Sequence, residues 1–385
     1  MTEFGWTFSL IQSGSPVTMA DMQTFTDIGE GDMFYICCAL LTTTDLKQLY
    51  QTSKQCRLKT SSQLFARVCI LATDVLLSVT FNTDLDPMAD FVKWLLIENP
   101  SDLSALKLTH NVTLLTFGQH FNEPLGVLPA GVTQLKFGSR FNQPLAVGVL
   151  PAGVKHLTFG SDFNQPLAAG VLPAGVTLLT FGSRYSGHIR MSDFNQPLTK
   201  GVLPGSVRKL TFGNHFNKPL AESVLPAGVT QLMFGQNFNQ PLAEGVLPAG
   251  VTQLTFGHNF NQPLAEGVLP ASAAHNKKHL ELPGSVRKLT FGCDFNQPLA
   301  EGVLPAGVTH LTFGRYFNQP LTVGVLPASL SQLTFGFKFN QPIGEGVLPA
   351  SLSQLTFGDC FNQPLAEGVL PASAAHNKKH LEIRA

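Results

Sequence analysis

The sequence predicts an α+β protein, in which a small α-helical N-terminal region precedes a parallel β-solenoid of eleven coils. The segment Leu-Thr-Phe-Gly-x-x-Phe-Asn-Gln-Pro-Leu, found at residues 254–264, recurs along the chain, usually every 22 residues. Repetition at a fixed period of about 20–50 residues is typical of a solenoid or a repeat array. Residues 28–108, before the first copy, instead place their apolar side chains at helical intervals.

Each copy contributes one constant leucine, which lies two residues before its first phenylalanine. These leucines are Leu115, Leu135, Leu157, Leu179, Leu210, Leu232, Leu254, Leu289, Leu311, Leu333 and Leu355. Residues 110–371 therefore form the predicted solenoid, with insertions at 184–192, where a strand ends, and at 271–283, on the back of a coil.

A short strand is predicted near residues 253–256 of the typical coil. Leu254 and Phe256 are two residues apart, which is the strand period, so both side chains should face the core. Gln253 and Thr255 should then face solvent. Successive coils should pair these strands in a parallel ladder.

The rest of the coil is expected to be extended. Gly257 should end the strand, where a positive φ or a close backbone approach requires glycine. Phe260 should return to the core, and Asn261 should turn inward to form an asparagine ladder between coils. Because Pro263 and Pro270 lack the N–H that a helix needs, no regular helix is expected on the back of the coil.

The outward strand positions form a candidate partner-binding face. The predicted face comprises Gln134, Lys136, His156, Thr158, Lys209, Gln231, Gln253, Thr255, Lys288, His310, Gln332 and Gln354. Variable pairs follow each glycine beside this face, for example Asn214-His215, Arg315-Tyr316 and Phe337-Lys338. A surface that is merely solvated remains the alternative interpretation.

Residues 28–62 predict two short amphipathic helices joined by a turn. The first helix has an apolar face, and it is followed by Asp45-Leu46-x-x-Leu49 and Ser53-Lys54-x-x-Arg57. This pattern resembles an F-box, and the resemblance implies docking onto the Skp-type adaptor of a cullin ubiquitin ligase. The residues expected to bind that adaptor are Phe34, Ile36, Leu40, Leu41, Asp45, Leu46 and Leu49. The simpler alternative is a helical cap for the solenoid.

The remaining segments are assigned as connections and caps. Residues 1–27 form a leader without a strong pattern, in which residues 1–9 alternate weakly; a short strand and a disordered leader are the two alternatives. Residues 63–109 predict a helical linker and N-terminal cap, including a helix that starts at Asp86-Pro87 and contains Trp94, Leu95 and Ile97. Residues 372–385 form a predicted C-terminal tail or cap.

The repeats resemble the FNIP repeat, a leucine-rich-repeat relative named for Phe-Asn-x-Pro. Phe163-Asn164-Gln165-Pro166 is a typical copy, and the third residue is Gln, Glu or Lys in place of Ile. F-box domains that precede FNIP repeats are a known architecture. The resemblance implies a leucine-rich-repeat-like fold and a protein-interaction role.

The composition argues against nucleic-acid binding and indicates the compartment in which the protein is found. The chain has 25 basic and 25 acidic residues, and the slight basic surplus after residue 110 is too small for a nucleic-acid-binding surface. Six cysteines without CxxC spacing indicate reduced thiols in a cytoplasmic, or alternatively nuclear, protein. We expect neither a signal peptide nor a membrane span.

The sequence contains no catalytic or cofactor motif. The His-Asn-Lys-Lys-His segments at 275–279 and 376–380 lack the Glu of HExxH and a nearby third ligand, so no metal site is predicted. Two functional classes follow: a non-enzymatic F-box adaptor whose repeats hold an unknown substrate protein, or a scaffold without a ligase link. Binding of a repetitive ligand by the outward threonine column is a remote third class, because Lys136 and Met233 interrupt that column.

Overall fold

The computed structural model describes residues 112–182, 192–270 and 286–372, together with the backbone of five short strands outside these ranges. The chain divides into two compact units, Met1–Thr116 and Phe117–Ala385. The residues expected to form the F-box-like helices lie outside the described part of the chain, and so does the tail from residue 373.

The first unit contains short strands. Strands β1 (Thr7–Ser9) and β2 (Pro16–Thr18) form an antiparallel pair, which agrees with the weak alternation of residues 1–9. Trp94–Ile97 forms strand β3, so the helix expected over these four residues is wrong. The run Trp-Leu-Leu-Ile is rich in residues that favour strands, and short apolar runs do not distinguish a helix from a strand. Strand β4 (Leu114–Phe117) crosses the boundary between the units.

The second unit confirms the predicted parallel β-solenoid, but with about ten coils in place of the expected eleven, because strand β4, which carries Leu115, lies mostly in the first unit. Its described strands that carry the constant leucine are β5 (Gln134–Lys136), β6 (His156–Phe159), β7 (Leu178–Phe181), β10 (Lys209–Thr211), β11 (Gln231–Met233), β12 (Gln253–Thr255), β13 (Lys288–Thr290), β14 (His310–Thr312), β15 (Gln332–Thr334) and β16 (Gln354–Thr356). Each pairs in parallel with the next, and constant leucines face each other, as Leu232 faces Leu254.

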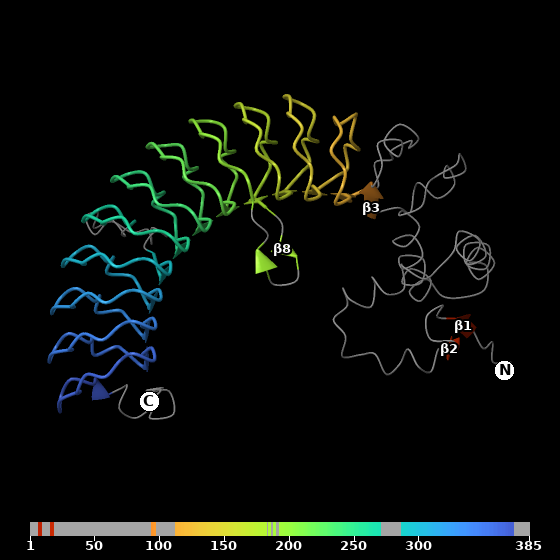
Figure 1. Ribbon diagram of the computed structural model, residues 1–385. Coiled ribbons are helices and arrows are strands. Elements are labelled where there is room, and N and C mark those ends of the chain that lie inside the picture. The colour runs from red at the N-terminus through yellow and green to blue at the C-terminus, as the bar shows by residue number, and fades with distance from the viewer. Residues whose placement is uncertain are drawn as a thin grey trace, which may run out of the picture. The chain divides into compact units, whose positions relative to one another are not determined.

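The core is a column of leucines and two columns of stacked phenylalanines. Phe260 is completely buried, and its ring lies 4.0 Å from Phe256 of the same coil. Between coils, the rings of Phe256 and Phe291 are 5.7 Å apart, and those of Phe260 and Phe295 are 6.2 Å apart. Hydrogen bonds hold paired strands about 4.8 Å apart. The coils are therefore closer at the strands than deeper in the core, and they fan into an arc with the strands on its inner side (Figure 1).

The backs of the coils are extended, as expected from their prolines, which do not favour a helix. Between Val112 and Pro371 the described residues contain no helix. This extended back segment buries pairs of apolar side chains such as Val268 and Leu269, which are 5% and 2% exposed. Within the described residues, no helix is long and apolar enough to cross a membrane.

Close stacking of the coils requires glycine after most of these strands. A Cβ on Gly257 would collide with the backbone carbonyl of Gly235 in the preceding coil. The same is true of Gly235 against Gly213 and of Gly292 against Gly257. These three glycines do not have positive φ values, so close approach is the reason that applies to them. Gly182, which follows β7, has φ 97°, and there the backbone conformation also requires glycine.

Apart from Gly182, the described glycines with positive φ form a second column, in the turn on the back of the coil. Gly201, Gly245 and Gly267 have φ values of 87°, 81° and 83°. In one coil Ser223 occupies this position with φ 62°, and it is the one non-glycine residue with positive φ in the described part of the chain. A left-handed conformation costs a residue with a Cβ roughly 1–2 kcal/mol.

Replacing Ser223 with glycine is therefore expected to raise the free energy of unfolding by about 1 kcal/mol, because glycine adopts this conformation without strain. Urea denaturation followed by circular dichroism measures the change. Ser223→Ala is the matched control: it keeps the Cβ and should give no gain. Equal stabilisation by both variants would contradict the strain argument.

The first insertion forms a hairpin at the strand end of its coil. Strands β8 (Arg184–Tyr185) and β9 (His188–Ile189) pair antiparallel and lie on the inner side of the arc (Figure 1). The chain rejoins the stack at Ser192, whose carbonyl accepts a hydrogen bond from His215 N at 3.0 Å. Ser192 thus takes the position expected for Ser183, which moves the insertion to 183–191. Sequence alone could not distinguish these two serines.

The second insertion preserves the stack on both sides. Val286 N donates to the carbonyl of Pro270 at 3.2 Å, as Val251 N does to Pro248 in the preceding coil. Strand β13 then pairs with β12 in the usual register. The insertion therefore lies between Pro270 and Val286.

Candidate partner-binding surface

The predicted face lies on the solvent side of the parallel sheet. We call the outward-facing residues of strands β5–β7 and β10–β16 the strand face. None of the twelve predicted residues is buried: Gln253 is exposed and Thr255 is half-buried, while Leu254 between them is 1% exposed. Gln231, Gln253 and Lys288 occupy one register position on successive strands. Their role in binding remains a prediction.

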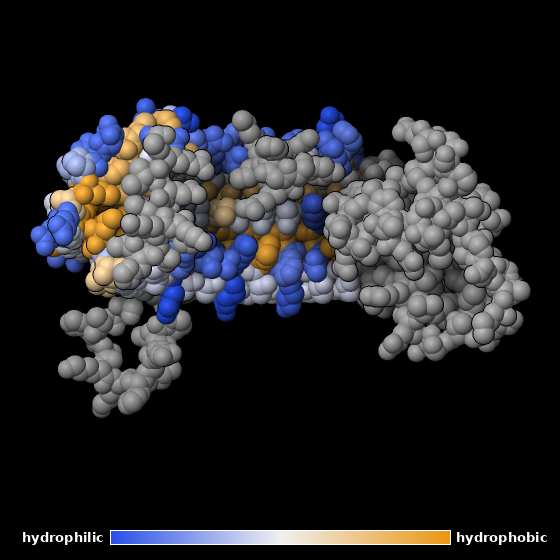
Figure 2. Space-filling model, turned by 90° about the horizontal axis from the view of Figure 1, so that it is seen from below, coloured by the Kyte–Doolittle hydropathy of each residue, from blue (hydrophilic) through white to orange (hydrophobic). Residues whose placement is uncertain are grey.

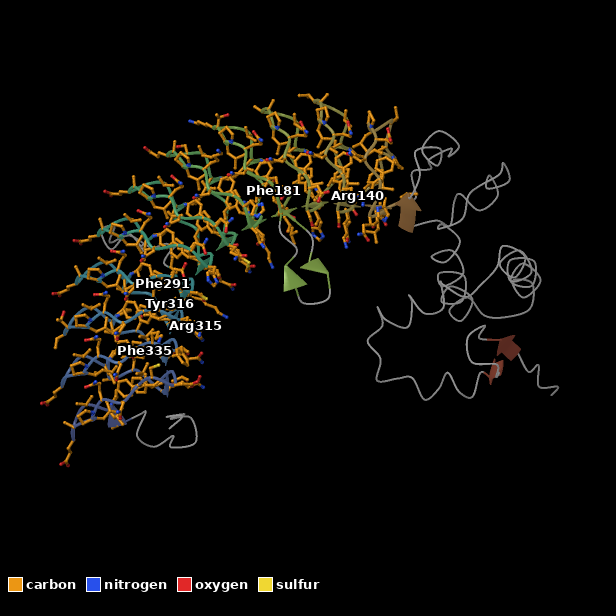
Figure 3. The ribbon with its side chains drawn as sticks, viewed as in Figure 1. Arg140, Phe181, Phe291, Arg315, Tyr316 and Phe335 are labelled. Atoms are coloured by element: carbon orange, nitrogen blue, oxygen red, sulfur yellow. The ribbon has the colours of Figure 1, made fainter. Side chains whose placement is uncertain are left out.

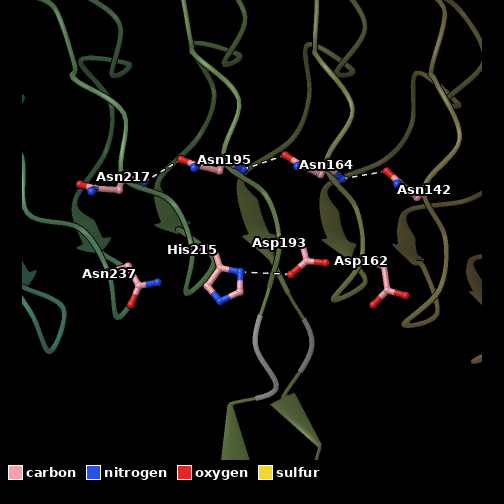
Figure 4. Close-up of a pocket in the computed structure, with 8 residues that line it drawn as sticks. All are labelled: Asn142, Asp162, Asn164, Asp193, Asn195, His215, Asn217 and Asn237. Atoms are coloured by element: carbon pink, nitrogen blue, oxygen red, sulfur yellow. Dashed lines mark hydrogen bonds and ion pairs between the residues drawn. The ribbon is translucent and has the colours of Figure 1, made fainter.

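The asparagines after the second phenylalanine form the expected ladder. Asn164 N donates to Asn142 Oδ1, and Asn195 N to Asn164 Oδ1, each at 2.9 Å (Figure 4). Gln196 Nε2 also donates to Asn164 Oδ1, at 3.1 Å. The asparagines are half-buried, however, and so they line the surface of the bend as well as cross-linking the coils.

A polar groove of about 520 Å³ lies along this ladder. Its second wall comprises residues from the variable positions after glycine: Asp162, Asp193, His215 and Asn237 (Figure 4). His215 Nδ1 lies 3.1 Å from Asp193 Oδ1, within hydrogen-bonding distance. The hairpin β8–β9 leaves the stack immediately before Asp193, so the regular surface is interrupted here.

The groove is lined by hydrogen-bonding groups rather than by apolar side chains. Small-molecule pockets are mostly lined by apolar and aromatic side chains, whereas amide, carboxylate and imidazole groups line this groove. Among the described residues, no three His, Cys, Asp or Glu side chains lie close enough together to hold a metal ion. An extended segment with donors and acceptors would fit such a surface.

The pairs after each glycine vary in sequence, but the sequence pattern did not predict which of their side chains are neighbours in the structure. The 22-residue register places Asp193 beside His215, and Arg315 beside Phe337. Tyr316 and Phe337 are 44% and 36% exposed, unlike the phenylalanines of the core. Alignment of the copies was the signal that could have found these neighbours.

Polar and apolar residues occupy different parts of this side of the solenoid. Figure 2 shows hydrophilic residues along the edges of the solenoid in this view, with apolar residues between them. Figure 3 shows Arg140 and Arg315 toward the side where the strands lie, while Phe181, Phe291 and Phe335 lie within the coils. The labelled arginines are therefore on the side of the strands, and the labelled phenylalanines belong to the core.

Comparisons with known proteins agree with this geometry. The family described as FNIP Repeat matches five segments that together cover more than half of the chain: residues 141–184, 194–237, 238–275, 295–338 and 339–376. No curated protein sequence matches. The fold is similar to a crystal structure of CroV588, described as a novel circular LRR protein, with 45% sequence identity and a TM-score of 0.64. That match covers 73% of this chain and 38% of the other, so this chain spans well under half of that protein's length.

Proposed function

Because the chain belongs to the FNIP-repeat family, we propose that its solenoid is a protein-binding scaffold whose strand face holds a partner protein. A leucine-rich-repeat-like solenoid is consistent with an interaction module. One observation carries the proposal: side-chain variation is concentrated on the exposed positions. Register partners on the strand face include Gln, His and Lys, whereas the inward position between them is always leucine.

A rigid ladder of this kind is a favourable binding surface. Strand pairing and the asparagine ladder already fix the backbone, so little conformational entropy is lost when a partner binds. The hairpin and the polar groove beside Asp193 interrupt the repetition. A partner that contacts this interruption is fixed in one register along coils that are otherwise nearly identical.

A photo-cross-linking amino acid at Gln253, on the strand face, is expected to cross-link to a partner protein in an extract of the source cells. The same group at Glu266, an exposed residue in the back turn of the same coil, should not. Mass spectrometry of the cross-linked products identifies the partner and the site. Equal cross-linking from both positions, or from Glu266 alone, would refute the strand face as the binding surface.

The finer proposal is that the chain recruits substrates to a cullin-type ubiquitin ligase, in the cytoplasm or nucleus. Asp45-Leu46-x-x-Leu49 and Ser53-Lys54-x-x-Arg57 support it by resembling an F-box that precedes FNIP repeats. The N-terminal helices would then bind the Skp-type adaptor, and the strand face would hold the substrate. A scaffold without this link is the alternative, and it needs only the solenoid.

Purified Skp-type adaptor is expected to bind the full chain, and Leu46→Asp with Leu49→Asp should abolish the binding. Charges in a small apolar interface leave buried groups unpaired, which removes most of the affinity. A quantitative pull-down measures the effect, and circular dichroism checks that the solenoid of the variant stays folded. If the unmodified chain fails to bind any adaptor of this type, the ligase role is wrong and the scaffold remains.

A further inference from the structure

Two exposed aromatic side chains and two cations form a cluster beside strands β14 and β15. We call Arg315, Tyr316, Phe337 and Lys338 the aromatic–basic cluster. Tyr316 and Phe337 are the exposed aromatic residues of the described chain, at 44% and 36%. Adjacent exposed aromatics of this size need a reason, because apolar surface in contact with water is unfavourable.

The stacking of the coils creates this cluster. Arg315 and Phe337 occupy the same position of successive coils, 22 residues apart, as do Tyr316 and Lys338. Tyr316 N donates to the carbonyl of Cys293 at 2.9 Å, and Lys338 N donates to that of Arg315 at 2.8 Å. The four side chains therefore project from a backbone that is hydrogen-bonded from coil to coil.

Arg315 has its guanidinium within cation–π distance of both rings. Its guanidinium carbon lies 5.2 Å from the ring centre of Phe337 and 5.8 Å from that of Tyr316, and Lys338 Nζ lies 5.5 Å from the Phe337 centre (Figure 3 labels Arg315 and Tyr316). Cation–π contacts restrain the guanidinium without using its N–H groups. Its planar fork thus stays available for a carboxylate at a reduced cost in side-chain entropy.

The positive charge of the cluster is not neutralised by the described residues. No carboxylate among them lies within ion-pair distance of Arg315 or Lys338, although Asp294 and Asp359 belong to the neighbouring coils. Asp294 lies 3.7 Å from His258, on the other side. Two adjacent cations beside two aromatic rings are chemically complementary to an anionic group that has an apolar neighbour.

We propose that the aromatic–basic cluster is the docking point for an acidic segment of the protein partner, in which an Asp or Glu side chain is next to an aromatic or aliphatic residue. The carboxylate accepts hydrogen bonds from the Arg315 guanidinium, with Lys338 as the second cation. The apolar neighbour covers the exposed rings of Tyr316 and Phe337. Arg and Tyr are also the residue types that dominate binding energy in protein interfaces. This inference rests on the proposed scaffold function and adds the chemistry of the partner.

Selection of a random-peptide display library on the full chain tests the proposal. Selected peptides should be enriched in Asp or Glu beside an aromatic or aliphatic residue. Fluorescence anisotropy with a labelled selected peptide should show binding weakened about tenfold or more by Arg315→Ala, the size of effect given by losing a charge-assisted hydrogen bond. Arg315→Lys keeps the charge but loses the fork, so it should give an intermediate loss.

Arg140→Ala is the matched control, because Arg140 is an exposed arginine in the same kind of bend, with no ring of the described residues beneath it. It should change the affinity less than about twofold, as distant exposed charges are largely screened. Peptides without acidic residues, no selected peptide, or equal losses in both arginine variants would overturn the proposal. So would a labelled single-stranded oligonucleotide that binds more tightly than the peptide and loses affinity in Arg315→Ala.

These outcomes are separable from the scaffold function. Cross-links from Gln253 that persist in an Arg315→Ala chain, together with failed peptide selection, would leave the strand face in place and remove the cluster as a docking point. Absence of the Gln253 cross-links in both the unmodified chain and the Arg315→Ala chain, with acidic peptides still bound at Arg315, would remove the strand face as the binding surface and keep the cluster as a docking point. The melting temperature of Arg315→Ala should be unchanged, because the side chain is exposed.

Discussion

Replacing Phe260 with alanine is expected to lower the free energy of unfolding by about 3–5 kcal/mol. The ring is completely buried and packs 4.0 Å from Phe256, with Phe238 and Phe295 stacked at 6.1 and 6.2 Å. Alanine removes the transfer free energy of the ring and leaves a cavity that the hydrogen-bonded coils cannot close. Urea denaturation followed by circular dichroism gives the change.

Thr255→Ala in the same coil is the control for Phe260→Ala. Thr255 points away from the core and is half-buried, so its loss should stay within about 0.5 kcal/mol. Coils contact mainly their neighbours, so a central cavity also weakens the coupling between the two halves and should broaden the transition. If Thr255→Ala were the more damaging change, the assignment of the strand's inner and outer sides would be reversed.

Replacing Gly257 with alanine is expected to destabilise the solenoid by about 3 kcal/mol or more, the upper part of the range for overpacked interiors. The new Cβ would occupy the space of the Gly235 backbone carbonyl, which cannot rotate away as a side chain could. The two coils must separate, which strains the pairing of β11 with β12. Denaturation with urea is again the measurement, and weaker protection of the β11–β12 amides from hydrogen exchange should accompany it.

Gly205→Ala is the matched control for Gly257→Ala. Gly205 also lies in the solenoid and has no positive φ, but an added Cβ there would meet nothing within 4 Å. Alanine should be neutral or slightly stabilising at that position, because it restricts the unfolded chain. Similar losses at both positions would indicate that glycine is needed for backbone freedom rather than for close stacking.

Much of the candidate site was predictable because it follows from local chemistry. The two-residue spacing of Leu254 and Phe256 placed Gln253 and Thr255 outside, and the structure agrees. The asparagine ladder also followed from the repeat, although Asn142 and Asn164 are half-buried and border the groove rather than facing fully inward. For Trp94–Ile97 the local pattern fitted both helix and strand, and the structure has a strand there.

The sequence by itself determined the parallel solenoid, its inward leucines and phenylalanines, and its extended back. These properties depend on periodicity and on prolines, which act within one coil. The tertiary structure alone decided why glycine is needed after most of the strands, how the coils fan into an arc, and which variable side chains meet. Those features depend on the distances between residues of different coils: the contact of Gly257 with Gly235, the separation of Phe260 from Phe295, and the position of Arg315 over Phe337. Such distances are set by the packing of one coil against the next.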